Sequence, residues 1–232
     1  PGRIDDPSRH NHQQTERHAM IVLVGSEKGG TGKTTIATNL SAMRAQEGFD
    51  VLLLDTDLQG SATYWCRTRD DAKITPAVFC TQKFGRIDDE AAKLTRKFDD
   101  IIIDSGGRDS EEIRSSMLVA HRVYIPISPS QFDLWSLTSM AAMAKKAAVL
   151  NPKMRARILL NRASTNPSVT EAEEAREMIG QLNGLEMSSA MLRDRIAFRR
   201  AVRDGLSVVE MKQKDAKAVD EIQTLYQEIY HG

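Results

Sequence analysis

Two lysines lie in a glycine-rich segment, "SEKGGTGKTT" (residues 26–35), that directly follows the apolar run "MIVLVG". Glycines that link a strand to a helix let backbone N–H groups converge on a phosphate, and the helix N-terminus also favours negative charge. One lysine is enough to hold a phosphate, so the second needs its own explanation. The segment therefore predicts a nucleotide phosphate site with an extra cation.

The order of residues in this segment gives them separate tasks. The usual phosphate loop, G-x-x-x-x-G-K-[ST], requires glycine at position 27, where this chain has Glu27. The rest of the pattern fits. Lys33 is expected to reach the β and γ phosphates, the Thr34 hydroxyl to bind Mg²⁺, and Thr35 to donate to the α phosphate. The loop backbone around the phosphates is predicted to come from Gly29, Gly30, Thr31 and Gly32.

Carboxylates end two further apolar runs. "VLLLDTD" carries Asp55 and Asp57, and "IIIDSGG" carries Asp104. Acids at positions i and i+2 of a strand point to the same face, so Asp55 and Asp57 are expected to address one site. An acid at a strand end can hold Mg²⁺ through water, which is the role predicted for Asp104.

These motifs resemble those of the ParA/MinD family of ATPases, whose deviant phosphate loop reads K-G-G-x-x-K-[ST]. The resemblance implies that ATP and Mg²⁺ are the cofactors and that ATP binding forms a homodimer. Lys28 would then reach across the dimer to the phosphates bound by the other subunit, while Lys33 serves its own nucleotide. Asp57 would position or activate the attacking water, and Asp55 would support the Mg²⁺ region. The family usually has proline where this chain has Leu58.

Three later segments extend the resemblance. The glycines at 106 and 107 would form a switch that senses the γ phosphate. "YIPISPSQFDLWSL" (124–137) is similar to a stretch that lines the dimer interface, and "ILLNR" (158–162) makes Asn161 the candidate contact for adenine. No glutamine or arginine finger is evident at a strand end. We therefore expect slow basal hydrolysis until a partner orders the switch.

The elements that must position these residues follow from hydrophobic patterning. Short apolar runs without polar alternation predict strands buried on both faces; they lie at 20–24, 51–55, 77–81, 101–105, 123–128 and 156–161. Amphipathic segments between or after them predict helices; they lie at 33–47, 88–97, 109–119, 131–149, 169–182 and 214–230. This alternation indicates an α/β fold with one mostly parallel, twisted sheet and helices on both faces, as in P-loop NTPases of the deviant Walker type.

The chain of 232 residues is expected to form one domain over residues 20–232. The polar residues 1–19 are interpreted as a disordered arm or a remnant of expression, with Met20 as the natural start. Cys66 and Cys80 form no C-x-x-C pair, which sets aside an iron–sulfur carrier of the same superfamily. Lys28 argues against a biotin-pathway ligase, because those relatives lack the early lysine.

Arginines gather near the C-terminus, in "MLRDRIAFRRAVRDG" (191–205), although the formal net charge of the chain is zero. A helix through 195–203 would place Arg195, Arg199 and Arg203 on one face. Such a face suits the DNA backbone without base reading, and the resemblance implies non-specific DNA binding that depends on ATP. The alternative is a solvated face paired to acids such as those of "EAEEARE" (171–177).

The leading hypothesis is a ParA-type partitioning or positioning ATPase, cytoplasmic and nucleoid-associated. A ParB-like protein or cargo adaptor would stimulate hydrolysis and release the dimer from DNA, moving a plasmid, a chromosome region or a protein cargo. The alternative is a MinD-like regulator that cycles on a membrane. That class needs a basic amphipathic C-terminal helix, whereas 214–230 carries acids and few bases, so no membrane partner is expected.

Overall fold

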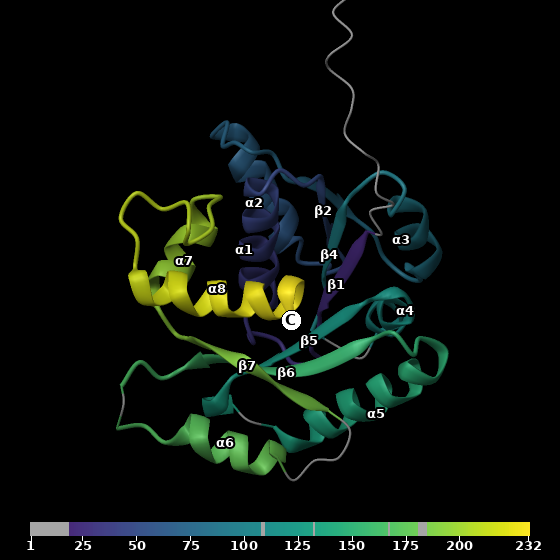
Figure 1. Cartoon of the computed structure of the whole chain (residues 1–232), viewed down its shortest axis with the longest axis vertical. Helices are drawn as coiled ribbons and strands as arrows, with labels where there is room; N and C mark the ends of the chain where they lie inside the picture. The colour runs from purple at the N-terminus through teal and green to yellow at the C-terminus, as the bar shows by residue number, and fades with distance from the viewer. Residues whose placement is uncertain (1–18, 108–109, 132, 167, 181–184) are drawn as a thin grey trace, which may run out of the picture.

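The computed structural model describes residues 19–107, 110–131, 133–166, 168–180 and 185–232. The predicted arm, apart from Ala19, lies outside the described residues. Seven parallel strands form one sheet in the order β3-β2-β4-β1-β5-β6-β7, which confirms the predicted fold class (Figure 1). The strands are β1 Met20–Val24, β2 Val51–Asp55, β3 Phe79–Gln82, β4 Asp100–Asp104, β5 Arg122–Ile127, β6 Arg155–Ala163 and β7 Glu186–Arg193.

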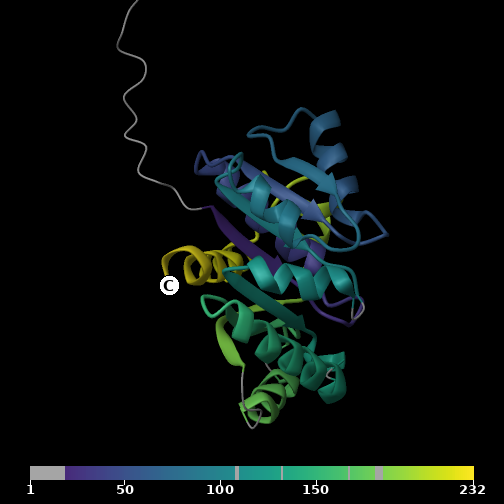
Figure 2. The ribbon, with the colours of Figure 1, turned by 90° about the vertical axis from the view of Figure 1, so that its right-hand side faces the viewer.

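Helices cover both faces of the sheet, as the two views in Figures 1 and 2 show. One face packs on α1, α2, α7 and α8, and the other on α3, α4, α5 and α6. The helices are α1 Lys33–Gln46, α2 Ser61–Asp71, α3 Asp88–Leu94, α4 Glu111–Val119, α5 Leu134–Leu150, α6 Glu171–Gly180, α7 Ile196–Arg203 and α8 Ala216–His231. A short 3₁₀ turn, η1 Pro129–Gln131, precedes α5. None of the described helices is both long and apolar enough to span a membrane.

The strand sequences lack polar alternation because each strand feeds two cores. In β1, Val22 and Val24 enter the core under α1, whereas Ile21 and Leu23 enter the core under α4 and α5. Strands β2 and β4 divide their side chains in the same way. Both faces of the sheet are therefore buried against helices, which is usual for a parallel sheet.

The two edge strands and one helix depart from the expectations. The strand expected at 77–81 is observed as the shorter β3, whose edge position leaves most of its residues exposed. Strand β7 was not predicted, because its sequence "EMSSAMLR" alternates between buried and exposed positions and contains two serines. Helix α2 was also missed. The expected helix at 195–203 begins at Ile196, and Arg195 has the extended backbone of an N-cap residue, with φ −93° and ψ 138°.

The strand order brings the acidic strand ends beside the glycine-rich loop. Strand β1 pairs with β4 on one side and β5 on the other, so the chain crosses over at this point of the sheet. In the strand register, Asp104 is aligned with Val24 of β1 and with Asp55 of β2. Ligands of open α/β sheets bind outside the carboxyl ends of the strands at such a switch point.

Candidate phosphate and metal site

The loop between β1 and α1 has the backbone conformations that its glycines allow. Gly30 and Gly32 have φ values of 76° and 87°, in the left-handed region that favours glycine. A Cβ at position 32 would also fall 2.2 Å from the Asn161 side-chain nitrogen. Glycine is therefore favoured at position 32 both by the positive φ angle and by the close approach of the Asn161 side chain. Gly29 and Gly30 are exposed, which leaves their side of the loop open.

Lys33, the first residue of α1, turns its side chain back onto this loop. Its Nζ donates to the backbone oxygen of Lys28 at 2.9 Å, and the side chain is buried. Burial lowers the pKa of the Lys33 ammonium, and the carboxylates of Asp104 and Asp57 act in the opposite direction. A buried ammonium that rests on a loop carbonyl can exchange that contact for a phosphate oxygen at low cost.

Thr34 and Asp104 are brought together as predicted. The Thr34 hydroxyl donates to Asp104 Oδ2 at 2.6 Å. Asp104 is fully buried, and its Oδ1 has no hydrogen-bond partner among the described residues. Burial raises the pKa of Asp104 to about 7. An unpartnered buried carboxylate oxygen beside a threonine hydroxyl is a donor set that fits a hard cation such as Mg²⁺.

Asp55 occupies the predicted place but is engaged with the protein itself. Its Oδ2 accepts from the Thr63 backbone N–H and hydroxyl, both at 2.9 Å, and its Oδ1 accepts from the Asp57 N–H at 3.0 Å. The expectation that Asp55 and Asp57 share one strand face is wrong, because β2 ends at Asp55 and Asp57 lies in the loop. Asp55 thus anchors the start of α2, while the half-buried Asp57 stands beside the site.

The predicted switch turn packs between the phosphate loop and Asp57. A Cβ at Gly107 would lie 3.2 Å from the backbone N and Cα of Gly29. A Cβ at Gly106 would lie 3.8 Å from the Cα of Asp57. Residues 108 and 109 of the same segment lie outside the described residues. The turn therefore contacts both the loop and the carboxylate that were assigned to catalysis.

Asn161, the candidate for adenine, lies at the end of β6 and holds the phosphate loop. Its side-chain nitrogen donates to the Thr31 carbonyl at 2.6 Å. Next to it is a cavity of about 140 Å³, which Thr35 also lines. Arg195 and Arg199, which were assigned to DNA, line the same cavity. The cavity therefore lies between the start of α1, the end of β6 and the start of α7.

The three arginines predicted to bind DNA differ in environment. The Arg195 guanidinium donates from Nε and Nη2 to one oxygen of Glu221 of α8, Oε1, at 2.9 and 2.7 Å. Arg199 lies 3.7 Å from Asp194, and Arg203 pairs with Asp204 at 2.7 Å on the exposed surface. Their acidic neighbours are therefore not those of 171–177. Arg199 and Arg203 share the exposed side of α7, and Arg195 does not belong to that helix.

Two contacts of the phosphate loop were missed by sequence reasoning. Arg162, near the end of β6, has φ 58° and donates from Nη1 to the Gly30 carbonyl at 2.8 Å. Its only sequence signal was its place after Asn161. In addition, the Ser139 hydroxyl of α5 donates to Glu27 Oε1 at 2.7 Å. Glu27 thus ties the loop to a helix.

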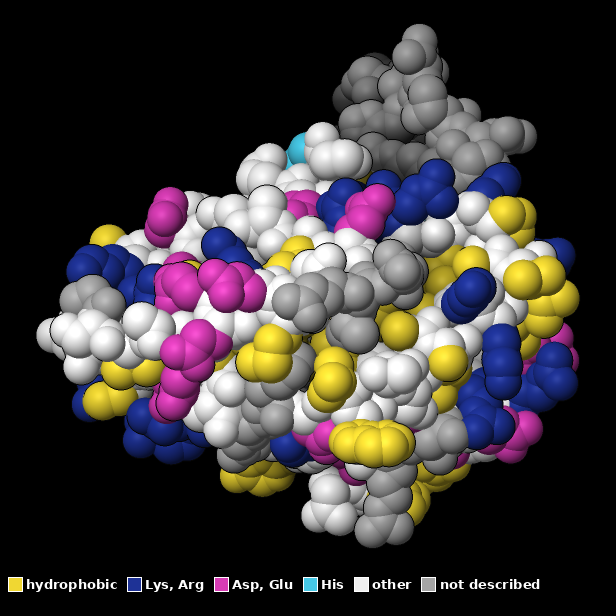
Figure 3. Space-filling model, turned by 90° about the horizontal axis from the view of Figure 1, so that it is seen from below, with side chains coloured by type: hydrophobic (Ala, Val, Ile, Leu, Met, Phe, Trp, Pro, Cys, Tyr) yellow, Lys and Arg dark blue, Asp and Glu magenta, His cyan; other side chains and the backbone are white. Residues whose placement is uncertain are grey.

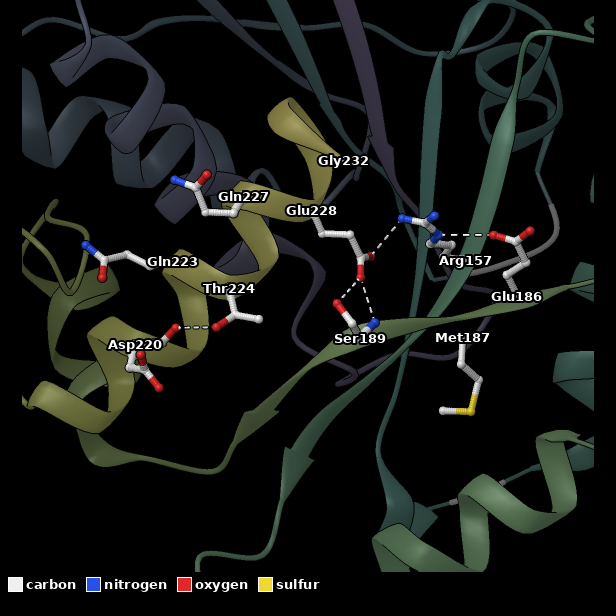
Figure 4. Close-up of a pocket in the computed structure, with 10 residues that line it drawn as sticks. All are labelled: Arg157, Glu186, Met187, Ser189, Asp220, Gln223, Thr224, Gln227, Glu228 and Gly232. Atoms are coloured by element: carbon white, nitrogen blue, oxygen red, sulfur yellow. Dashed lines mark hydrogen bonds and ion pairs between the residues drawn. The ribbon is translucent and has the colours of Figure 1, made fainter.

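A larger hollow of about 840 Å³ lies between α8 and β7, away from the loop (Figure 4). Figure 4 shows the carboxylate of Glu228 in contact with Arg157 and Ser189, which also line the hollow. Its carboxylate accepts from the Tyr124 and Ser188 hydroxyls and from the N–H and hydroxyl of Ser189, and Arg157 lies 3.3 Å away. Both oxygens of this carboxylate have hydrogen-bond partners within the chain. Glu228 therefore differs from Asp104, which has an oxygen without a partner among the described residues.

Comparison with known proteins gives a consistent result. Residues 22–208 match the family model described as "CobQ/CobB/MinD/ParA nucleotide binding domain". The chain is 30% identical over 215 residues to "Maintenance of carboxysome distribution protein A" from Halothiobacillus neapolitanus, covering 91% of this chain and 96% of that protein. It is 25% identical over 201 residues to "Protein ParA" from Rhizobium radiobacter, covering 84% and 87%.

Solved structures agree in fold. An ATP complex of Cyanothece McdA superposes with a TM-score of 0.72 at 16% identity, covering 92% of this chain and 97% of that one. A putative plasmid partition protein from Borrelia burgdorferi bound to AMPPNP gives a TM-score of 0.69 at 17% identity, covering 92% and 98%. At these identities the superpositions establish the fold alone.

Proposed function

The chain belongs to the family of CobQ/CobB/MinD/ParA nucleotide-binding domains, and from this premise we propose that it is a positioning ATPase of the ParA type. The observation that carries the proposal is the buried Asp104, beside the buried Lys33: one of its oxygens accepts from the Thr34 hydroxyl, and the other has no partner within the part of the chain that the structure describes. Such an incomplete set of charges at a helix N-terminus is suited to a nucleotide triphosphate with Mg²⁺.

In this proposal each residue has a defined task. Lys33 leaves the Lys28 carbonyl and contacts the β and γ phosphates, which also receive backbone N–H groups from residues 29–34. Thr34 and Asp104 hold Mg²⁺, which supplies charge neutralisation at the β and γ phosphates. Asp57 orients the attacking water, and Asp55 supports the site by fixing the start of α2. The nucleoside occupies the cavity beside Asn161.

Dimerisation on ATP is supported by the surface next to the loop. Trp135 is 89% exposed at the start of α5, and Leu58 is 81% exposed just after Asp57. Large apolar side chains exposed around a polar site are typical of an interaction surface. A second copy that covers them would bring its Lys28 to the first copy's phosphates. Because the added cation arrives only when both subunits close, ATP occupancy and pairing are coupled.

The DNA contact is assigned chiefly to Arg199 and Arg203. Their neighbouring acids are on the surface, where ion pairs are weak, so DNA phosphates can compete for the guanidinium groups. Arg195 contributes less directly, because Glu221 holds it at the wall of the nucleoside cavity. Pairing two copies doubles the arginine surface, which makes DNA affinity depend on ATP through avidity.

The cargo is proposed to be a protein assembly, recognised through an adaptor that stimulates hydrolysis. Support comes from the relative named for carboxysome distribution, which matches this chain over almost its whole length. A plasmid or chromosome region is the alternative cargo. A membrane cycle is not favoured, because Ile222, Leu225 and Ile229 of α8 are buried against the body of the protein.

The proposal is tested by measuring mass in solution and DNA binding under the same conditions. With a non-hydrolysable ATP analogue and Mg²⁺, light scattering should give a dimer, and DNA should shift with ATP but not with ADP. Lys28→Ala should abolish pairing, whereas Lys97→Ala, which changes an exposed lysine in the turn between α3 and β4, should not. A wild-type chain that stays monomeric with the analogue, or that hydrolyses no ATP, would refute the proposal.

A further inference from the structure

A groove of about 730 Å³ runs between α4 and α5. From α4 it is lined by Glu111, Arg114, Ser115 and Leu118, which follow the i, i+3, i+4, i+7 spacing of one helix face. The α5 wall has the same spacing from Ser139 to Leu150 and is about 17 Å long at 1.5 Å per residue. The α4 wall, from Glu111 to Leu118, is about 10 Å long on the same basis, so the two helix faces form a channel for about two to three turns of a third helix.

The floor of the groove is apolar and its rim is basic. Leu118 and Met143 are half-buried in it, and Leu150 is 74% exposed at one end. Three cationic side chains and one carboxylate, Glu111, line it; the cations are Arg86, Arg114 and Lys146. Arg86 is already paired with Asp88 at 2.8 Å, so the net positive charge of the rim comes from Arg114 and Lys146. On the face seen in Figure 3, apolar and basic side chains gather on the right, the side on which Figure 1 draws α4 and α5. This combination complements an apolar stripe with acidic flanks.

Both walls of the groove are connected to the nucleotide site. On the α5 side, the Ser139 hydroxyl holds Glu27, which takes the place of the first phosphate-loop glycine. On the α4 side, Ser110 caps the helix a few residues after the turn in which Gly107 packs on Gly29. A ligand that changes the spacing of α4 and α5 therefore acts on the loop and on the switch turn together.

We propose that the groove between α4 and α5 binds an acidic, amphipathic helical segment of the protein that stimulates ATP hydrolysis. A helix that lays its apolar face in such a groove is a common mode of peptide recognition. The inference rests on the proposed function, because it names the surface through which that function is regulated. The acidic flanks of the segment meet Lys146 and Arg114 of the rim, and its apolar stripe covers Leu118 and Met143.

The test uses the full chain and a displayed library of 18-residue helical peptides. Every peptide carries Leu or Ala at i, i+3, i+4 and i+7, and Glu, Lys or Gln at the flanking positions. Selection on the chain with an ATP analogue and Mg²⁺ should enrich peptides with acidic flanks. Lys146→Glu should weaken the selected peptide at least tenfold by fluorescence anisotropy. The matched Lys145→Glu, exposed on the same helix outside the groove, should change affinity less than twofold.

The bound peptide should also raise the steady-state rate of ATP hydrolysis at least threefold, and Ser139→Ala should reduce that stimulation. No enrichment, enrichment of basic flanks, or equal affinity for wild type and Lys146→Glu would overturn the docking site. Binding without a change in rate would overturn its link to hydrolysis. Basal hydrolysis is measured separately. A chain that binds the peptide but hydrolyses no ATP refutes the proposed function and leaves the groove supported.

Discussion

Two buried charged clusters of this protein have opposite hydrogen-bonding states. In the first, the fully buried guanidinium of Arg69 makes a bidentate pair with Glu210 at 2.7 and 2.9 Å. It also donates to the carbonyls of Pro76 and Gly205 and lies 5.4 Å from the ring of Trp65. This cluster joins α2 to the segment between α7 and α8, and it needs nothing from outside the chain.

The second cluster, Lys33 with Asp104, is incomplete. Lys33 rests on a loop carbonyl, and Asp104 Oδ1 is buried without a partner among the described residues. Leaving a buried polar group unpaired costs about 1–3 kcal/mol. The difference indicates that a buried charge fully satisfied within the chain stabilises the fold, whereas a buried charge left incomplete awaits a ligand. The following substitutions test that distinction, beginning with the largest effect.

Removing one partner of the complete cluster should be the most damaging change. Arg69→Ala leaves Glu210 buried and unpaired, and breaking a buried pair in this way costs about 3–5 kcal/mol of unfolding free energy. Urea denaturation measures the loss. Arg203→Ala, which removes an exposed arginine paired with Asp204, is the control and should leave the unfolding midpoint unchanged. A loss below about 1 kcal/mol for Arg69→Ala would contradict a structural role for the cluster.

The incomplete cluster should respond in the opposite way. Asp104→Asn removes a charge that burial disfavours, so stability without nucleotide should be unchanged or higher. Hydrolysis dependent on Mg²⁺ should fall at least about 100-fold, because the metal loses its carboxylate. Denaturation and a steady-state phosphate assay on the same preparation check both results. If Asp104→Asn destabilised the fold as much as Arg69→Ala, the two clusters would not differ in kind.

The sequence predicts the incomplete cluster far better than the complete one. Lys33 and Thr34 belong to a local pattern in which strand, glycine loop and helix follow one another, so their positions depend on a few consecutive residues. Asp104 is found because parallel strands place their carboxyl ends along one edge. Arg69 and Glu210 are 141 residues apart and carry no local signal. Their pairing depends on how α2 packs against the chain after α7.

Edges and helix ends account for the other differences. Strand β7 has a single neighbouring strand, so its sequence is not a continuous apolar run and escaped prediction. A shift of one residue in the start of α7 removes Arg195 from the predicted helical face and brings it to Glu221 on α8. Asp55 was identified by position, but its bonds to Thr63 depend on α2, which was not predicted.

A third buried acid tests the limits of the comparison. Asp100 accepts from Arg44 at 2.6 Å, yet its Oδ1 also lacks a partner among the described residues. Burial raises its pKa from 3.8 to about 6. The fold therefore favours the neutral form, and the resulting stability is present below pH 3.8 and is lost as pH rises through about 6. Asp100 lies at the opposite end of β4 from Asp104 and from the nucleotide motifs. It is therefore a buried acid with an unpartnered oxygen among the described residues and no proposed ligand.

The pH dependence of Asp100 is measured against a variant that does not titrate there. Between pH 4 and pH 7, the unfolding free energy of wild type should fall relative to Asp100→Asn by about 2 kcal/mol, since one pKa unit is equivalent to about 1.4 kcal/mol. Urea midpoints at both pH values give the difference. Mg²⁺ and ATP should leave this difference unchanged. A pH-independent difference would show that Asp100 is charged throughout and that Arg44 satisfies it.

The smallest effect is expected at the one hydrogen bond that the described residues give the Asp104 carboxylate. Thr34→Val keeps the branched shape and a similar helix propensity but removes the hydroxyl that donates to Asp104 Oδ2. It should cost about 1 kcal/mol at pH 8, where the carboxylate would be charged and left without a donor. Thr34→Ser keeps the donor and should cost less than half as much. Equal losses for the serine and valine variants would mean that Thr34 contributes through packing. The hydrogen bond from the Thr34 hydroxyl to Asp104 would then add nothing measurable to stability.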